Sequence, residues 1–225
     1  MKKFVFLRGV IHKILRYLGK ERKWKSTADY WQSRYLAGKD SGSGSFNRLA
    51  FFKAKVINDF VKENGVRSVI EFGCGDGNQL LLAEYPSYIG YDIAEEAISI
   101  CKNKFKGDKS KVFVWSGDPN FICNNSAELV LSLDVIYHLV EDEVFDCYMR
   151  QLFESSDKYV CIYSCNDNNN QNVSRHVKHR VFTDWIINHK SGEWELLSII
   201  KNDYPYDPND SGNTSWSDFY FYKRC

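Results

Sequence analysis

The stretch VIEFGCGDGNQLL, residues 69–81, sets Gly73, Gly75 and Gly77 at alternate positions, directly after strand-forming residues that include Glu71. A strand, a glycine loop and a helix make a nucleotide site in a doubly wound sheet. Glycines let a ligand touch the backbone, and the helix N-terminus offers free N–H groups. The spacing differs from the G-x-G-x-x-G pattern of dinucleotide sites. A tight strand-to-helix turn with no ligand is the plainer alternative.

Three histidines are candidates for proton transfer. His138 follows the predicted strand 128–135, and His176 and His179 follow the polar loop CNDNNNQN that comes after the next strand. Because the carboxyl ends of parallel strands meet at one edge of a sheet, we expect all three around one pocket. Imidazole titrates near neutral pH, which suits a general base. The plainer interpretations are a structural histidine at 138 and a solvated basic turn at 174–180.

The H-x-x-H spacing of His176 and His179 also raises the question of a metal ion. A complete ligand set is what makes a zinc site, and no third ligand stands at a suitable spacing. The adjacent Arg180 would oppose a cation. We therefore expect no metal.

The elements that must position these residues alternate along the chain. Apolar periodicity predicts helices at residues 48–65, 78–85, 95–105 and 141–154. It predicts strands at residues 68–72, 88–93, 111–115, 128–135 and 158–164. Strands that alternate with helices indicate a parallel sheet with right-handed crossovers.

After Ser164 the pattern changes to a short helix at 182–189 and two strands at 194–202 and 218–223. No helix separates these two strands, so they should pair antiparallel at one edge of the sheet. The predicted fold is α/β: a Rossmann-like, doubly wound, seven-stranded mixed sheet with an antiparallel edge strand and helices on both faces.

The pattern E-x-G-x-G-x-G at residues 71–77 resembles the first motif of the class I S-adenosylmethionine-dependent methyltransferases. The resemblance implies that Glu71 serves the ammonium group of the cofactor and that the glycines lie close to its methionine and ribose portions. S-adenosylhomocysteine is the implied product.

The order of motifs downstream is similar to that family too. Asp92 ends the second strand, where the family's acid accepts both ribose hydroxyls, and Asp118 matches the acid near the adenine amino group. LVLSLDVIYHL matches the fourth-strand motif, in which Leu133 and Asp134 face the cofactor and the acceptor. The other residues implied to contact the cofactor are Asp76, Asn78, Gln79 and Ile93. An alternative for Asp92 is that it only caps the helix 95–105.

A smaller resemblance concerns residues that precede the core. ADYWQSRY, residues 28–35, and the loop SGSGS, residues 41–45, are similar to the cofactor cover of some small bacterial methyltransferases. By position, Tyr30, Trp31 and Tyr35 would line the methionine end of the cofactor or the acceptor pocket. An amphipathic helix that caps the core is the alternative.

Methyl transfer from a sulfonium is a direct displacement, in which the enzyme mainly aligns nucleophile, carbon and sulfur. An alcohol acceptor needs a general base, for which His138 is the first candidate, whereas a phosphate or carboxylate oxygen needs none. The N/D-P-P-Y motif of methyltransferases that act on amino groups of DNA or protein is missing from the sequence. We therefore expect O-methylation of a small molecule or glycan precursor.

The lysine-, asparagine- and tyrosine-rich composition is similar to that of methyltransferases in bacterial capsule and surface-polysaccharide clusters. An alternative within the class is methylation of nitrogen or of a phosphoryl-linked group on such a glycan. Alternatives from other classes are a non-catalytic cofactor-binding partner subunit and a nicotinamide dehydrogenase, which the glycine spacing disfavours.

Composition and charge restrict the partners. The 225 residues suffice for one α/β domain, and 44% hydrophobic and 26% charged residues are typical of a soluble protein. Residues 1–25 hold nine Lys or Arg and one Glu, and the remaining 200 residues carry a net charge of about −7. This acidic body argues against a nucleic-acid groove.

Residues 1–25 have apolar side chains at helical spacing between the basic ones, which predicts a basic amphipathic helix ahead of a single domain at 26–225. Such a helix either packs on the acidic body or lies on an anionic membrane surface. Arg8 interrupts its apolar run, so it is a poor signal peptide. Seven cysteines without a framework spacing indicate reduced thiols and a cytoplasmic protein, with residues 1–25 as a candidate contact to the inner membrane face.

Overall fold

The computed structural model describes residues 24–171 and 173–225. The helix predicted for residues 1–25 therefore lies almost entirely outside the described residues. The helices are α2 (Thr27–Leu36), α3 (Asn47–Glu63), α4 (Glu95–Lys104), α5 (Asp142–Glu154) and α6 (Phe182–Lys190). The strands are β1 (Val69–Phe72), β2 (Tyr88–Asp92), β3 (Lys111–Trp115), β4 (Ala127–Leu133), β5 (Ser156–Ser164), β6 (Trp194–Ile200) and β7 (Asp218–Arg224). Short 3-10 turns are η1 (Ser43–Ser45), η2 (Gln79–Leu82), η3 (Ile136–His138) and η4 (Pro208–Asp210).

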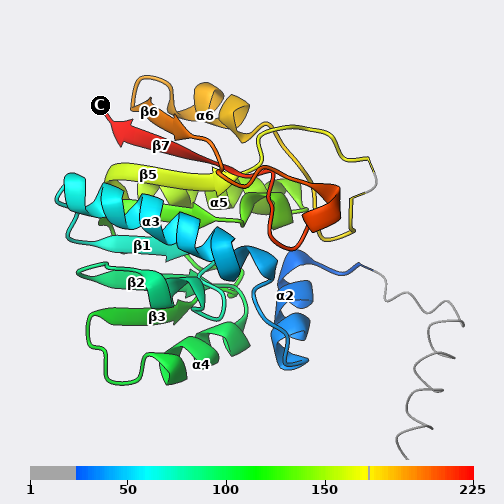
Figure 1. Cartoon of the computed structure of the whole chain (residues 1–225). Coiled ribbons are helices and arrows are strands. Elements are labelled where there is room, and N and C mark those ends of the chain that lie inside the picture. The colour runs from blue at the N-terminus through cyan, green and yellow to red at the C-terminus, as the bar shows by residue number, and fades with distance from the viewer. Residues whose placement is uncertain (1–23, 172) are drawn as a thin grey trace, which may run out of the picture.

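The strands form one seven-stranded sheet in the order β3-β2-β1-β4-β5-β7-β6 (Figure 1). The first five strands in this order are parallel to one another. β7 runs antiparallel to both β5 and the edge strand β6. The predicted mixed sheet with antiparallel pairing at one edge is confirmed, and the reversed strand lies second from that edge.

Helices cover the sheet on both faces, as predicted. α3 and α4 contribute Ile57, Val61 and Ile98 to a core on one face. α5 and α6 contribute Met149 and Phe182 to a core on the other. Strand residues alternate between the two cores: Val69 belongs to the first and Ile70 to the second, because successive side chains of a strand point to opposite faces.

The prediction of a helix at residues 78–85 is wrong, because the structure has only the 3-10 turn η2 there. The chain must reach β2 within a few residues, and the residue before Pro86 is disfavoured in a helix. Asn58 of α3 bonds the backbone instead. Its Nδ2 donates to the Leu82 carbonyl at 2.9 Å and its Oδ1 accepts from the Glu84 N–H at 3.0 Å. A side chain from α3 thus satisfies backbone groups of this turn.

α2 lies beyond the carboxyl ends of the parallel strands (Figure 1). Ser26 caps its N-terminus by accepting from the Asp29 N–H. The Thr27 hydroxyl donates to Glu141 Oε2 at 2.6 Å, and the Thr27 N–H donates to Glu141 Oε1 at 3.0 Å. These bonds fix α2 across the strand ends, where a site in such a sheet is expected.

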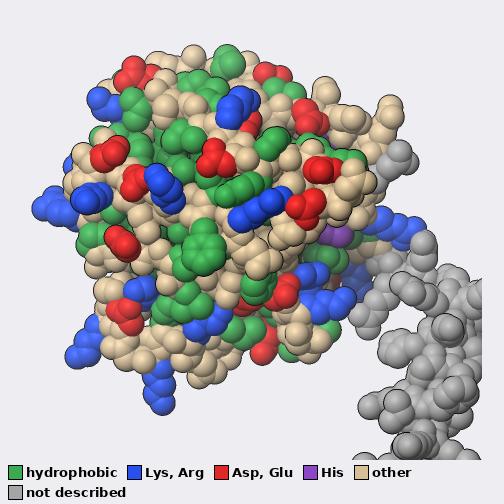
Figure 2. All heavy atoms as spheres, viewed as in Figure 1, with side chains coloured by type: hydrophobic (Ala, Val, Ile, Leu, Met, Phe, Trp, Pro, Cys, Tyr) green, Lys and Arg blue, Asp and Glu red, His purple; other side chains and the backbone are tan. Residues whose placement is uncertain are grey.

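On the face shown in Figure 2, basic and acidic side chains are interspersed, and neither sign dominates. Within the described part of the chain, no helix is both long and apolar enough to cross a membrane. All seven cysteines are free thiols, in agreement with the sequence-based expectation.

Candidate cofactor and acceptor site

The glycine loop connects β1 to η2, and each of its first two glycines is required for a structural reason of its own. A Cβ on Gly73, at φ 83°, would lie 2.4 Å from a methyl carbon of Val135. A Cβ on Gly75, at φ 56°, would lie 2.9 Å from the Tyr35 hydroxyl. Positive φ and close approach both exclude larger residues here. The first two glycines therefore keep the loop backbone accessible to whatever lies between it and α2.

Two buried carboxylates flank this loop. Glu71, on β1, is 5% exposed, and burial raises its pKa to about 7 although the Tyr88 hydroxyl donates to it at 2.6 Å. Asp92, which ends β2, is 7% exposed, and burial raises its pKa to about 6. The Gly75 N–H donates to Asp92 at 2.9 Å and the Ala94 N–H at 2.8 Å. Burying two acids costs free energy, and such sites are candidates for function.

These carboxylates line a cavity of about 120 Å³ between the glycine loop, α2 and the end of β4. Among the described residues, Gln79 Oε1 is a buried acceptor without a hydrogen-bond partner, and Gln79 lines the same cavity. The cavity thus offers two acids and an acceptor to a ligand that carries an ammonium group and hydroxyls. The predicted site residues that line it are Glu71, Gly73, Gly75, Gln79, Asp92, Ile93, Leu133, Asp134, Tyr35 and His138.

The cover, which we define as residues 27–46, closes this cavity from the side of α2. Tyr35 is buried, and its hydroxyl lies close to Gly75. Ser41 holds the loop after α2, because its N–H and its hydroxyl both donate to the Asp76 carboxylate, at 3.2 and 3.1 Å. Asn78 Nδ2 donates to the Ser45 carbonyl at 2.5 Å. Asp76 and Asn78 therefore bind the cover in this structure and do not line the cavity.

Asp134, directly after β4, is held in a strained backbone conformation by a polar network. Its φ is 58°, a region that non-glycine residues rarely adopt. Lys53 Nζ, on a side chain that is 1% exposed, lies 2.7 Å from Asp134 Oδ2. The Tyr137 and Ser217 hydroxyls donate to Oδ1 at 3.0 and 3.2 Å. Gly44 lies beside this carboxylate, and a Cβ there would lie 2.8 Å from Oδ2, so a larger residue would displace the Asp134 side chain.

His138 lines the same cavity, on η3. Burial lowers the pKa of its imidazole to about 4, so the ring is neutral at physiological pH. Nδ1 lies 3.0 Å from the His176 carbonyl oxygen and can only donate to it, which leaves Nε2 as an acceptor. The Trp31 ring packs edge-on, with centroids 4.9 Å apart. A neutral imidazole can accept a proton at Nε2, as a general base must, and the low pKa makes it a weak base.

A second cavity, of about 420 Å³, adjoins the first, and Asp134 lines both. Its lining includes Tyr137, Cys165 and His179. Tyr206 and Trp216, also in the lining, stack with ring centroids 3.6 Å apart. The remaining lining comprises five serines, Thr214, Asn169, Gln171, Asp134 and Asp167, together with Gly44, Leu49, Val173 and Val177. Aromatic faces combined with many hydrogen-bonding groups suit a polar ligand with several hydroxyls.

The expectation that all three histidines surround one pocket is not met. His138 lines the first cavity and His179 the second. The His176 ring stacks on Tyr30 at 4.3 Å and on His138 at 5.5 Å, and it lines neither. The chain between β5 and α6 turns His176 toward α2 and His179 toward Cys165. Loop geometry, which spacing does not encode, separates them.

Two further predicted contacts lie elsewhere. Asp118 is exposed and accepts from the Asn120 N–H at 2.8 Å, in a local turn after β3, and Ser116 takes its place in the cavity lining. Tyr30 stacks on His176 at the outer side of α2. Trp31 and Tyr35, in contrast, face the cavity as predicted.

Sequence reasoning missed Lys53 and the role of Cys165. The sequence carried a signal for Lys53, since it stands four residues after Leu49 and four before Ile57 on the buried stripe of α3. A lysine on such a stripe requires a buried partner. Cys165 was expected to be a reduced thiol, but it is also buried and its Sγ lies 2.7 Å from His179 Nδ1. Only the folded loop reveals that pair.

Residues 70–154, which run from β1 through α5, match the family described as "Methyltransferase domain". This chain contains a methyltransferase domain. The match includes the glycine loop, Asp92, Asp134 and His138. A comparison of the sequence with curated proteins finds no significant match.

Solved methyltransferase structures share the fold over most of the chain. An N-methyltransferase from Bradyrhizobium japonicum has a TM-score of 0.68 at 13% identity, with 89% of this chain and 98% of that chain covered. Magnesium protoporphyrin IX methyltransferase from Synechocystis has a TM-score of 0.65 at 15% identity, covering 88% and 98%. An S-adenosylmethionine-dependent methyltransferase from Clostridium acetobutylicum has a TM-score of 0.55 at 14% identity, covering 87% and 96%. The methyltransferase therefore has the Rossmann-like α/β fold of the class I enzymes.

The methyltransferase domain makes this chain an S-adenosylmethionine-dependent methyltransferase and implies S-adenosylmethionine as its cofactor. The dehydrogenase alternative is excluded by the same match. The residues of the first cavity fit that cofactor, because two buried acids and the free Gln79 oxygen complement its ammonium and ribose hydroxyls.

Proposed function

We propose that this methyltransferase transfers the methyl group of S-adenosylmethionine to a hydroxyl oxygen of a small polyhydroxylated acceptor, such as a sugar or glycan precursor. The observation that carries this proposal is the junction at Asp134. It joins a cavity with the chemistry for the cofactor to a second cavity that is polar, aromatic and larger. His138, neutral and with a free nitrogen, lines the first cavity beside Asp134.

Within the first cavity, Asp92 is the expected partner of the ribose hydroxyls, and Glu71 and Gln79 are the expected partners of the ammonium group. Asp92 already accepts two backbone N–H bonds, and each carboxylate oxygen has a further lone pair. Hydrogen bonds to a charged acceptor contribute more than neutral ones. Leu133 and Ile93 supply apolar wall beside them.

The bound cofactor supplies an electrophilic methyl group on its sulfonium. The protein must exclude water, align the acceptor oxygen with the methyl carbon and remove the hydroxyl proton. His138 Nε2 is the proposed acceptor of that proton. The Lys53–Asp134 ion pair would hold the acceptor by hydrogen bonds, because Asp134 faces both cavities.

The proposal of a small acceptor is supported by the size of the second cavity and by the mixed charge on the face in Figure 2. A polyanion such as a nucleic acid would favour a basic groove. The sequence resemblance to methyltransferases of surface-polysaccharide clusters points to a glycan precursor as acceptor. Cytoplasmic location follows the same proposal, since sugar nucleotides are cytoplasmic substrates.

The test has two stages. Calorimetry should first show stoichiometric S-adenosylmethionine binding that Asp92→Asn weakens by about 2 kcal/mol, because a charge-assisted bond is lost. Incubation with S-adenosylmethionine carrying a deuterated methyl group and a panel of sugar nucleotides should then give a product whose mass identifies the label. Fragmentation of that product locates the methylated atom.

Each alternative predicts its own outcome. If the label is found on an amino group or a phosphoryl-linked group, the enzyme methylates that group instead of a hydroxyl oxygen. Cofactor binding with no transfer to any acceptor, alone or with candidate partner proteins, would favour the non-catalytic subunit. Unchanged affinity in a folded Asp92→Asn variant would remove Asp92 from the ribose site.

A further inference from the structure

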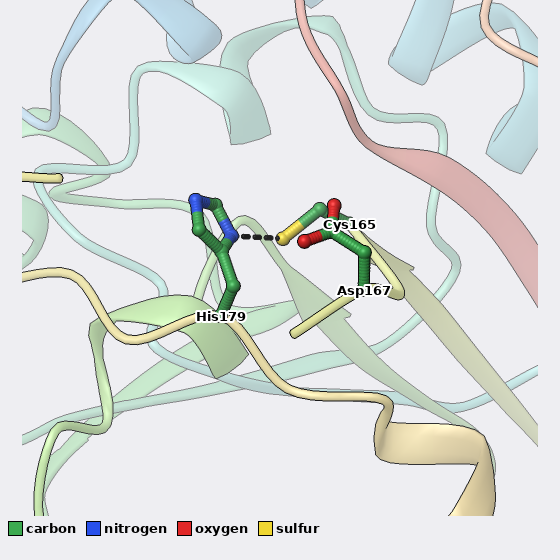
Figure 3. Close-up of side chains that lie close together, drawn as sticks. All are labelled: Cys165, Asp167 and His179. Carbon is green, nitrogen blue, oxygen red and sulfur yellow. Dashed lines mark hydrogen bonds between the residues drawn. The ribbon is translucent and has the colours of Figure 1, made fainter. Parts of the chain in front are cut away.

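Cys165, Asp167 and His179 form a cluster in the wall of the second cavity (Figure 3). Cys165 directly follows β5, Asp167 comes two residues later, and His179 returns from the loop that leads to α6. Their thiol, carboxylate and imidazole ligand atoms all lie within 4.8 Å of one another. The family match ends at residue 154, before these three residues, and the sequence pattern indicated only His179 among them, as a candidate base.

The surrounding structure holds the cluster in position. The His179 N–H donates to Asn170 Oδ1 at 2.7 Å, and Asn170 Nδ2 donates to the His179 carbonyl at 3.1 Å. The Trp216 ring packs edge-on against the imidazole, with centroids 6.0 Å apart. Cys165 is 3% exposed, whereas Asp167 is exposed. The thiol and imidazole are therefore anchored, and the carboxylate reaches them from the solvent side.

This donor set has a preference among metals. Magnesium and calcium take oxygen ligands, whereas a thiolate and an imidazole together suit zinc. Three protein ligands with a fourth position left open is the arrangement of catalytic zinc sites, while structural sites use four. Because the cluster faces a cavity of about 420 Å³, the open position is accessible to a ligand in that cavity.

The distances are close to those that zinc needs. With Zn–S about 2.3 Å and Zn–N about 2.0 Å, tetrahedral geometry separates the two ligand atoms by roughly 3.5 Å. Cys165 Sγ and His179 Nδ1 are 2.7 Å apart in their hydrogen bond. The site would have to widen by less than about 1 Å, which rotation of two side chains can supply. His176, the other histidine of the H-x-x-H pair, stacks on Tyr30 and takes no part.

We propose that Cys165, Asp167 and His179 bind a Zn²⁺ ion whose open position takes an oxygen of the methyl acceptor. The second half of this proposal rests on the proposed function. A bound cation lowers the pKa of a coordinated hydroxyl. In the transfer step the acceptor O–H bond loses its proton to a base, an O–CH₃ bond forms and the S–CH₃ bond breaks. The electron pair of that bond stays on sulfur, so the products are a methyl ether and S-adenosylhomocysteine.

The test measures metal binding without turnover. The full-length chain, stripped with a chelator and bearing Cys147→Ser and Cys225→Ser to remove the exposed thiols, is titrated with Co²⁺ and with Zn²⁺ against a chromophoric competitor. We expect one equivalent of Co²⁺ and a thiolate-to-cobalt charge-transfer band in the near ultraviolet. Cys165→Ser should abolish the band, and His179→Ala should weaken Zn²⁺ binding more than about 100-fold, since even loss of a supporting outer contact costs 10–100-fold. Asp167→Asn should weaken it less.

His189→Ala is the matched control, because His189 is exposed and stacks on Trp185, and it should leave the titration unchanged. Circular dichroism and thermal melting of each variant establish that it is folded. Wild-type protein that takes up no stoichiometric Co²⁺, or a folded His179→Ala variant with unchanged affinity, would overturn the site. Calorimetry with S-adenosylmethionine on the metal-free chain separates the two proposals. If the chain binds the cofactor but no metal, only the zinc site is rejected. If it binds the metal but no cofactor, only the cofactor assignment is rejected.

Discussion

At the scale of single residues, the first cavity concentrates groups that are costly to bury. Glu71 and Asp92 carry raised pKa values, and the His138 pKa is lowered, all mainly through burial. Asp134 adds a strained backbone. Proteins tolerate such costs where function requires them, so these residues are expected to show opposite effects on stability and on activity when replaced.

The substitution Glu71→Gln tests whether stability and cofactor binding change in opposite directions. Below about pH 4.5 the carboxyl is protonated in folded and unfolded chains alike. Between pH 4.5 and about 7 the unfolded chain releases the proton and the folded chain keeps it, so stability falls as pH rises through this window. The neutral glutamine lacks this penalty. At pH 8 the variant should therefore be more stable than wild type by up to about 3 kcal/mol, and at pH 4 it should not differ.

Urea unfolding at the two pH values, without cofactor, measures this difference. The exposed Glu84→Gln is the control and should show no pH-dependent gain. Calorimetry on Glu71→Gln should show weaker S-adenosylmethionine binding at pH 8. Equal stability of wild type and variant at both pH values would mean that Glu71 is not a buried acid in solution.

His138→Ala tests the general base. A positioned base contributes roughly 10²–10⁴-fold, so kcat should fall by that factor while cofactor affinity stays nearly constant. Because the His138 pKa is about 4, the wild-type kcat should be lost only as pH falls toward 4, and it should be flat above pH 6. The measurement is a pH profile of methyl transfer at saturating cofactor.

His189→Ala serves as the control histidine in that assay and should retain full activity. Full activity of His138→Ala would exclude His138 and would shift attention to His179 in the second cavity. Indifference at both positions would point to an acceptor oxygen that arrives already anionic, since it would need no base.

At the scale of elements, the cover formed by residues 27–46 controls access. The first cavity, about 120 Å³, is smaller than the roughly 300–1,000 Å³ of sites that enclose ligands of this size. The cofactor therefore needs the cover to move. Ser41 joins the cover to the glycine loop through two bonds to Asp76, and Ser45 joins it through the bond from Asn78.

Ser41→Ala removes the side-chain half of that contact and keeps the N–H bond. A hydrogen bond to a charged group contributes about 1.5–3 kcal/mol, so the dissociation rate constant of S-adenosylhomocysteine should rise roughly tenfold or more. Stopped-flow fluorescence of the nearby Trp31 can follow the release. Ser33→Ala, at an exposed position of α2, should leave the rate unchanged. Unchanged release from the folded Ser41→Ala chain would mean that the cover does not limit dissociation.

At the scale of the whole molecule, charge is divided between residues 1–25 and an acidic body. Each Lys or Arg near an anionic lipid surface contributes about 1 kcal/mol of binding. A helix packed on the acidic body is the rival interpretation of the same pattern. We expect packing on the body to prevail, because most amphipathic helices in proteins pack on a core.

Sedimentation with anionic vesicles separates these interpretations. If residues 1–25 pack on the body, the full chain and a chain that begins at Thr27 should bind phosphatidylserine vesicles equally weakly. Binding by the full chain alone, abolished at high salt, would assign residues 1–25 to the membrane surface. Neutral phosphatidylcholine vesicles are the control for apolar adsorption.

The sequence by itself determined the order of the elements, the mixed sheet and most of the cofactor cavity. Alternating strands and helices admit few topologies, and residues at the ends of β1, β2 and β4 must meet at one edge of a parallel sheet. Glu71, Asp92 and Asp134 were predictable for this reason, because local pattern and topology act in the same direction.

Only the tertiary structure decided the rest. Asp118 turns away within a local loop, Asp76 binds the cover, and η2 replaces a helix because Asn58 satisfies its backbone. The separation of His176 from His179, and the meeting of Cys165 with His179, depend on the path of a long loop. Loop conformation is set by contacts between distant residues, and periodicity carries no information about such contacts.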